Sequence, residues 1–224
     1  MDPAMGPVTI DCRLGDGEAT CAEPTLVSGS SLDLVMDRLS PVITERAIRA
    51  QTGRLLMLHA CGLADPSTGA TVVLAATSGT GKTTLARTLG DQLAYVTDET
   101  IAITREGTVV PYPKPLSVLN GAGATYKDQT PASKTCLTAF GGKARVAAIA
   151  IMHRQPGRAG VEVERLATLH ALAALAPHGS LLGELEHPLS WMADLLHRTG
   201  GLRLVRYAEA STLRPFVGSL LGAG

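Results

Sequence analysis

Aromatic residues are scarce in this sequence of 224 residues, where phenylalanine, tyrosine and tryptophan together make up only 3%. Leucine, valine, alanine and isoleucine must therefore fill the core, and a hydrophobic fraction of 45% suffices for a globular one. An excess of charge is also lacking, because 20 basic side chains balance 20 acidic ones. Nucleic-acid binding and polybasic membrane attachment both need a basic excess. We therefore expect neither a nucleic acid nor a membrane as a partner.

Long hydrophobic runs are absent too, and none approaches the ~18 residues that span a bilayer. The N-terminal stretch MDPAMGPVTIDCRLGDGE has early acids and no apolar core of a secretory signal. The four cysteines, Cys12, Cys21, Cys61 and Cys136, form no C-x-x-C pair. A Cys12–Cys21 disulfide is an alternative, but reduced thiols are the better interpretation without a signal. The sequence therefore predicts a cytoplasmic protein.

Strand and helix patterns alternate along the chain, which predicts an α/β fold and a single domain over residues 1–224. Residues 111–143, rich in Pro, Gly, Ala, Lys and Thr, predict either a mobile functional loop or secondary structure that the local patterns do not reveal. Hydrophobic spacing, caps and turn residues mark the remaining elements. These are, in order, short strands within 7–35, a helix that starts at Ser40 and stops at Gly53, a strand ending near His59, a strand over 70–76, a helix over 82–93, a strand over 94–104, a strand over 144–154, helices over 167–179 and 188–200 with Gly179 and Gly200 at their ends, and a strand over 201–210.

The stretch ATSGTGKTT, residues 76–84, follows an apolar strand and opens a helix. It matches the phosphate-binding pattern G-x-x-x-x-G-K-[ST] except at its first position. Backbone N–H groups of such a turn point inward, and the helix N-terminus adds partial positive charge. Lys82 would reach the terminal phosphates and Thr83 would bind Mg²⁺. The predicted nucleotide-binding residues are Thr77, Ser78, Gly79, Thr80, Gly81, Lys82, Thr83 and Thr84.

Ala76 stands where the pattern has glycine. An alanine is tolerated there if its φ stays negative, because the first position only begins the turn. The alternative is a glycine-rich turn with an incidental lysine, which does not bind phosphate.

Two acids, Asp98 and Glu99, follow Lys82 at the distance expected for the neighbouring strand. A carboxylate at a strand end beside a phosphate loop can hold Mg²⁺ or accept a proton from an attacking hydroxyl. The alternative is an edge strand with solvated acids. His59, in LHACGLA, is the third candidate, although a single histidine on an apolar strand is as often structural.

Together LHACGLA, ATSGTGKTT and YVTDETIAI resemble the C-terminal catalytic domain of HPr kinase/phosphorylase and the shorter HPr-kinase-like ATP-binding proteins, best over residues 55–120. PYPKPLSVL, next along the chain, resembles the proline-rich segment of the short members. The resemblance implies a P-loop-containing mixed β-sheet flanked by helices. It also implies an ATP- and Mg²⁺-dependent serine kinase that acts on a peptide or small protein, in some members a natural-product precursor. A homo-oligomer is expected because the family often forms rings.

Carried over onto this sequence, the resemblance gives catalytic roles to Lys82, Asp98 and His59. Asp98 would accept the proton of the incoming hydroxyl, and His59 would orient the acid pair. Thr83, Asp98 and Glu99 would hold Mg²⁺. ATP and Mg²⁺ are thus the expected cofactors.

The chain departs from the family in three places. Ala76 replaces a glycine, Glu99 replaces a second aspartate, and no Glu-x-Arg-Gly context follows downstream. Two other functions therefore stay open: a small-molecule kinase, and a nucleotide-binding regulator with little turnover.

The remaining polar residues carry weaker predictions. The lysines of the long loop either clamp phosphates or face solvent, and solvent is expected for most of them. The other histidines are expected to be structural or solvated, because they lack metal-ligand spacing with cysteine. Trp191 is expected to anchor the core. The lysines are Lys114, Lys127, Lys134 and Lys143, and the histidines are His153, His170, His178, His187 and His197.

Overall fold

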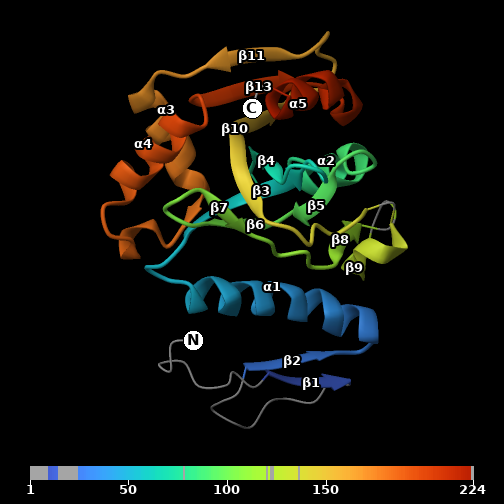
Figure 1. Cartoon of the computed structure of the whole chain (residues 1–224). Coiled ribbons are helices and arrows are strands. Elements are labelled where there is room, and N and C mark those ends of the chain that lie inside the picture. The colour runs from blue at the N-terminus through green and yellow to red at the C-terminus, as the bar shows by residue number, and fades with distance from the viewer. Residues whose placement is uncertain are drawn as a thin grey trace. The chain divides into compact units, whose positions relative to one another are not determined.

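The computed structural model describes residues 10–14, 25–77, 79–119, 121, 124–135 and 137–222. The chain divides into two compact units (Figure 1). Unit 1 comprises Met1–Gln51 and Pro115–Thr130, and unit 2 comprises Thr52–Lys114 and Pro131–Gly224. The chain thus enters unit 2, returns to unit 1 for a short segment, and enters unit 2 again. That residues 1–224 form one domain stays a prediction.

Unit 1 contains one long helix and two strand pairs. Strands β1 (Ile10–Leu14) and β2 (Thr25–Gly29) pair in parallel, and β8 (Leu116–Leu119) pairs antiparallel with β9 (Lys127–Thr130). Helix α1 (Leu32–Ala50) packs against β2 and β9. The hairpin β8–β9 lies in the segment for which the sequence predicted either a loop or secondary structure without a local pattern.

Helix α1 begins at Leu32, eight residues before Ser40, so the predicted start is wrong. Its N-cap is Ser31, whose side chain accepts a hydrogen bond from the Leu34 N–H at 3.3 Å. Pro41 lies inside the helix rather than in its first turn. The Thr44 hydroxyl donates to the Ser40 carbonyl at 3.0 Å, which is one turn earlier and close to the proline. Ser40 and Pro41 have the residue types of a helix start, which is why the sequence predicts one there. The helix continues through Pro41 because its packing compensates for the missing N–H of the proline, and local sequence does not report packing.

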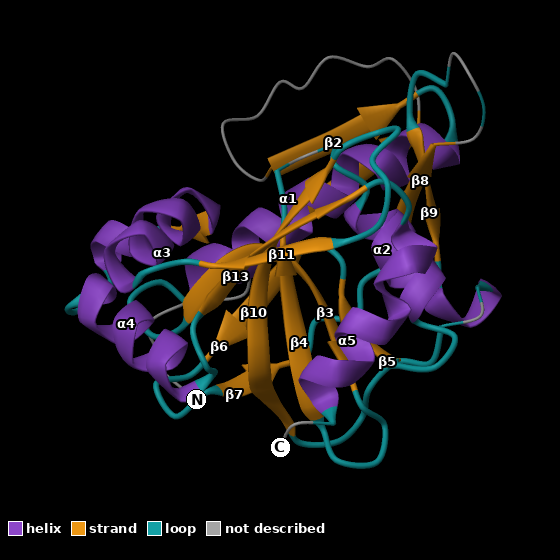
Figure 2. Cartoon of the chain, turned by 90° about the horizontal axis from the view of Figure 1, so that it is seen from above, coloured by secondary structure: helices purple, strands orange, loops and turns teal. Residues whose placement is uncertain are grey.

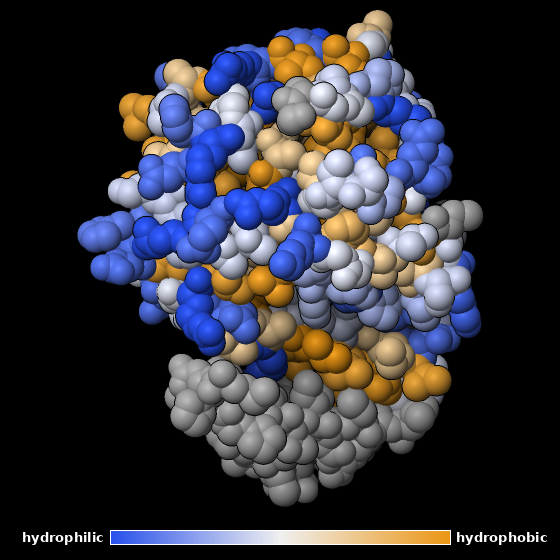
Figure 3. Space-filling view, in the orientation of Figure 1, coloured by the Kyte–Doolittle hydropathy of each residue, from blue (hydrophilic) through white to orange (hydrophobic). Residues whose placement is uncertain are grey.

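Hydrophobic side chains also lie along α1 on the face seen in Figure 3. Leu32, Met36 and Ile43 are exposed, and their spacing places them on one side of the helix. Val35 and Thr44 are its buried residues. Helix α1 therefore carries a hydrophobic stripe in addition to its buried positions.

Unit 2 is built on a mixed sheet of nine strands in the order β11-β13-β10-β4-β3-β6-β7, with β5 and β12 also paired to β3. Strands β4, β10 and β13 run parallel, and the other pairs are antiparallel. Strand β7 returns to pair with the start of β10 and closes β10, β4, β3, β6 and β7 into a ring. The strands are β3 (Leu56–Ala64), β4 (Ala70–Ala75), β5 (Ala94–Thr97), β6 (Thr100–Ile103), β7 (Thr108–Val110), β10 (Ala144–Arg154), β11 (Glu162–Arg165), β12 (Gly179–Ser180) and β13 (Leu202–Tyr207).

Helices cover both faces of this sheet. Helices α3 and α4 lie on one side of β10 and β13, and α2 and α5 lie on the other (Figures 1 and 2). The predicted mixed sheet flanked by helices is therefore confirmed. The helices are α2 (Lys82–Leu89), α3 (Thr168–Leu175), α4 (Pro188–Arg198) and α5 (Arg214–Leu221), and the short 3₁₀ turns are η1 (Ala132–Lys134), η2 (Ala176–His178), η3 (Leu182–Glu184) and η4 (Ala210–Leu213).

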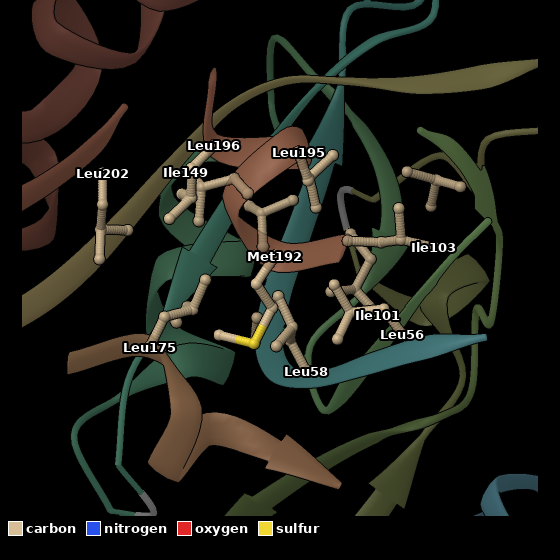
Figure 4. Close-up of a cluster of buried hydrophobic side chains, with 14 of the residues drawn as sticks. Leu56, Leu58, Ile101, Ile103, Ile149, Leu175, Met192, Leu195, Leu196 and Leu202 are labelled. Carbon is tan, nitrogen blue, oxygen red and sulfur yellow. The ribbon is translucent and has the colours of Figure 1, made fainter. Parts of the chain in front are cut away.

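The core between the sheet and helices α3 and α4 is almost entirely aliphatic, as the composition predicts. Leu58 and Ile101 from the sheet meet Leu175 and Met192 from the two helices (Figure 4). Trp191 is 4% exposed, so its predicted place in the core is confirmed. The Arg105 guanidinium lies over its ring, 4.7 Å from the centroid.

Several predicted boundaries are wrong for identifiable reasons. The strand expected over 94–104 is two strands, because β5 stops before Asp98 and β6 restarts at Thr100. Gly179 has φ −81° and begins β12 instead of closing a helix in the left-handed conformation, whereas Gly200 does so with φ 74°. Strand β11 and helix α5 were not predicted. No helix in the described part of the chain combines the length and hydrophobicity that crossing a membrane requires.

Candidate functional site

The glycine-rich loop follows the carboxyl end of β4, and β4 lies between β10 and β3 in the sheet. Ala75 ends β4 opposite Ile151 of β10, and α2 begins at Lys82. Gly79 and Gly81 have φ of 80° and 95°, a region that side-chain-bearing residues rarely adopt. A Cβ on Gly79 would meet nothing within 4 Å, so its backbone borders open space. The strand–loop–helix order that the sequence predicts is confirmed.

Ala76 is fully buried and lies outside the left-handed region. Among the described residues other than glycine, only Leu181 and His187 have positive φ. The methyl group therefore causes no backbone strain, as expected for a residue that only begins the turn.

Lys82 folds back over the loop. Its ammonium donates to the carbonyls of Ala76 at 2.9 Å and Thr77 at 3.1 Å, and the residue is only 8% exposed. A buried ammonium needs such acceptors, because desolvation without them is costly. An anion bound in the loop would offer the same charge stronger partners.

Two threonines, Thr77 and Thr80, stabilise the loop at its surface. The Thr77 and Thr80 hydroxyls are 2.7 Å apart, and the Thr80 hydroxyl also lies 2.8 Å from the Thr77 carbonyl. Thr84 is exposed in the first turn of α2. Within the described residues no side chain caps this helix, and its first turn holds no acid. Its first N–H groups therefore remain suited to an anion. Ser78, also predicted to bind nucleotide, lies outside the described residues.

Asp98 joins the loop to the rest of the sheet. The Thr83 hydroxyl donates to Asp98 Oδ2 at 2.6 Å, and the Tyr95 hydroxyl lies 2.8 Å from Asp98 Oδ1. Burial, and then the Asp98 charge, raises the pKa of Tyr95, so its hydroxyl stays protonated and donates. Asp98 is 5% exposed, and both of its oxygens have a donor.

Glu99 points to a different partner. Its Oε2 lies 2.9 Å from the Lys114 ammonium, and its backbone carbonyl accepts from the Ala60 N–H at 3.1 Å. The Lys114 side chain is 5% exposed. The expectation that Lys114 faces solvent is therefore wrong.

His59 lies within β3, opposite Thr100, and not near the strand's end as predicted. The strand runs to Ala64 because the residues after His59 are buried and pair with β4. Burial first, and then the Lys82 charge, lowers the pKa of His59, while the Glu99 carboxylate opposes this change. His59 thus lies within electrostatic range of both Lys82 and Glu99.

His178 joins this group, although the sequence favoured a structural or solvated role for it. It ends η2 directly before β12, whose Gly179 pairs with Leu58, so the register leads His178 toward His59. Burial, and then Lys82, lowers the pKa of His178, and His178 in turn lowers that of His59. The chain order gave no signal for this pair, because the two histidines come from distant segments.

Cys61 is fully buried on β3, two residues after His59. Burial, and then the Asp98 charge, raises its pKa, so the thiol stays neutral and is a poor nucleophile. Covalent cysteine chemistry is therefore not supported at this site.

The residues present fit a magnesium ion. Mg²⁺ usually takes one or two carboxylates, keeps several waters and completes its shell with substrate phosphates. The hydroxyl of Thr83 and the carboxylate of Asp98 are neighbours at the mouth of the loop. Among the described residues, there is no cluster of three or more Asp, Glu, His or Cys side chains that could hold a metal ion. Any metal here must therefore rely on few protein ligands.

Comparisons with known proteins leave the family open. No family model and no curated protein matches the chain. Among solved structures, the Hpr(Ser) kinase/phosphatase from Coxiella burnetii is similar, with a TM-score of 0.36 and 13% sequence identity, over 74% of this chain and 93% of that one. Because a similarity this low does not establish a function, the function is inferred from the site residues.

Proposed function

We infer that this protein is an ATP- and Mg²⁺-dependent kinase that transfers the terminal phosphate to a hydroxyl group. One observation carries the proposal: Thr83, at the start of the helix after the glycine-rich loop, is hydrogen-bonded to Asp98 of the acid pair at 2.6 Å. A phosphate cradle and a carboxylate that binds the metal or accepts the hydroxyl proton are recurring parts of phosphoryl-transfer sites. The resemblance of the three sequence motifs to HPr-kinase-like proteins supports the same conclusion.

Each residue then has a defined task. The Lys82 ammonium exchanges the carbonyls of Ala76 and Thr77 for phosphate oxygens, and the backbone near Gly79 and Gly81 holds the rest of the triphosphate. Thr83 and Asp98 would hold Mg²⁺, which supplies charge to offset the phosphates. Tyr95 fixes the Asp98 carboxylate through its hydroxyl.

The transfer step requires a proton acceptor. The oxygen of the acceptor hydroxyl bonds to the terminal phosphorus while the bond from that phosphorus to the bridging oxygen breaks. The hydroxyl proton passes to a carboxylate oxygen of Asp98, and the nucleoside diphosphate leaves. His59 is near enough to the pair to orient it through Glu99.

The proposed acceptor is a serine of a peptide or small protein, as the resemblance implies. Purified protein would be incubated with ATP, Mg²⁺ and serine-containing peptides, including those encoded beside its gene. Mass spectrometry should find one added phosphoryl group on a serine. Lys82→Met and Asp98→Asn serve as inactive controls. Nucleotide hydrolysis that depends on a metabolite would indicate a small-molecule kinase, and tight binding without turnover would indicate a regulator.

A further inference from the structure

Lys114 has no place in the function argued so far, yet the protein buries it beside the acid pair. Its ammonium lies 2.9 Å from Glu99 Oε2, and the two side chains are 5% and 30% exposed. Burying an ammonium is unfavourable unless a charge partner and hydrogen bonds compensate for it. A lysine that served only solubility would not be held in this position.

The backbone around Lys114 is fixed as well. The Tyr112 N–H donates to the Val96 carbonyl of β5 at 3.1 Å, and the Lys114 N–H donates to the Tyr112 carbonyl at 2.9 Å. Prolines at 113 and 115 restrict the backbone on both sides. The segment is therefore anchored to the strand that leads into the acid pair.

The same contacts give the two acids different partners, a hydroxyl for Asp98 and an ammonium for Glu99. Asp98 lies with Thr83 at the mouth of the loop, whereas Glu99 lies with Lys114. The Tyr95 hydroxyl links the two halves, because it lies 2.8 Å from Asp98 Oδ1 and 3.2 Å from the Lys114 carbonyl. The adjacent carboxylates are thus distinguished by their surroundings.

We propose that Lys114 supplies the second positive charge of the site, in addition to Mg²⁺. Its ammonium then occupies the position beside Glu99 that a second metal ion would take. The site then binds one Mg²⁺, at Asp98 and Thr83, and Glu99 positions Lys114 instead of coordinating metal. A lysine at that place supplies a single positive charge that does not depend on the metal concentration. This inference rests on the proposed nucleotide site.

Metal counting tests the inference without measuring turnover. Mn²⁺ replaces Mg²⁺, and a non-hydrolysable ATP analogue is added to saturation. Electron paramagnetic resonance then counts the Mn²⁺ ions bound per protein molecule. Wild type and Lys114→Arg should bind one ion, and Lys114→Met should bind two, because Glu99 is released. Glu99→Gln should leave the affinity of the first ion unchanged. Asp98→Asn should weaken that affinity about tenfold or more, because even substitutions of residues that only support a metal ligand reduce metal affinity by about that factor.

Several outcomes would overturn the inference. These are two ions in wild type, one ion in a Lys114→Met protein whose thermal unfolding shows it to be folded, or an equal loss of affinity in Glu99→Gln and Asp98→Asn. If Lys114→Met does not fold, the comparison of Glu99→Gln with Asp98→Asn decides by itself. A wild-type protein that binds neither the analogue nor Mn²⁺ would remove the proposed function itself, and this inference with it.

Discussion

The glycine-rich loop and the acid pair are neighbours at one end of β4 and β5, but they are held in opposite ways. In the loop, Lys82 contacts the carbonyls of Ala76 and Thr77, and Thr77 contacts Thr80, all within a few residues of chain. At the acid pair, Asp98 depends on Thr83 and Glu99 depends on Lys114, each fifteen positions away. The loop is a local structure, and the acid pair is a tertiary one.

This difference predicts how each region responds to substitution. A change in the loop should alter ligand binding and leave the fold intact, because its contacts are short-range and partly exposed. A change around the acid pair should alter both chemistry and stability, because the groups are buried and share partners.

The largest effect is expected from Asp98→Asn. An amide cannot accept the acceptor's proton and holds a metal poorly, so the rate of transfer should fall about 10²- to 10⁴-fold. Phosphorylated product is measured over time. Asp194→Asn, an exposed carboxylate on α4, is the control and should keep full activity. A nearly normal rate in Asp98→Asn would mean that another group accepts the proton.

Lys82→Met tests the loop side of the comparison. Charge-assisted hydrogen bonds contribute about 1.5–3 kcal/mol, so the affinity for ATP should fall about 10- to 100-fold. Isothermal titration calorimetry measures the affinity. Lys143→Met removes an exposed lysine and should change nothing. Equal affinity in the two variants would show that the loop does not bind phosphate through Lys82.

Tyr95→Phe tests the acid-pair side. Asp98 Oδ1 loses its donor in a buried place, so the free energy of unfolding should drop by about 1–3 kcal/mol. Chemical denaturation measures this loss, and the transfer rate should fall with it. Tyr207→Phe, another buried tyrosine, is the matched control for stability. A transfer rate in Tyr95→Phe that equals the wild-type rate would mean that Tyr95 does not position Asp98.

A smaller effect is expected from pH, because His59 and His178 are only half-buried. Burial and Lys82 lower the pKa of each histidine below its ordinary value of 6.5. Between the lowered pKa and 6.5 the unfolded chain binds more protons than the folded one, so stability falls as pH falls through that window. The melting temperature should therefore decrease from about pH 7.5 to about pH 5.5.

The contribution of these two histidines is isolated by substitution. His59→Gln and His178→Gln should each flatten the pH dependence of the melting temperature, whereas His153→Gln, at an exposed position, should not. Identical slopes in all three variants would contradict the placement of the two histidines beside Lys82.

The smallest effect is expected from Ala76→Gly, which restores the usual residue of the pattern. The alanine causes no strain, so ATP affinity should stay the same and stability should fall by about 0.5–1 kcal/mol, because glycine gains more freedom on unfolding. Calorimetry and thermal unfolding measure both quantities. A clear gain in affinity would show that Ala76 does impair the loop.

Much of the fold could be predicted from the sequence. The strands at 70–75 and 144–154 and the helix from Lys82 are marked by local patterns: an apolar run, a glycine-rich turn and helical spacing. The break between β5 and β6 was missed because strand-forming residues stand on both sides of Asp98 and Glu99, which looks like one strand with acids at its centre. The pairing of β7 with β10, which closes the ring of strands, has no local signal at all.

The sequence by itself determined the glycine-rich loop, its lysine and the acid pair, because each lies in a few consecutive residues whose chemistry is readable in order. Only the tertiary structure decided that Thr83 bonds to Asp98, that Lys114 is buried against Glu99 and that His178 approaches His59. The reason is physical: burial and charge pairing depend on which distant segments the sheet brings together. The same lysine would be a solvated surface charge if residues 112–114 were not anchored to β5.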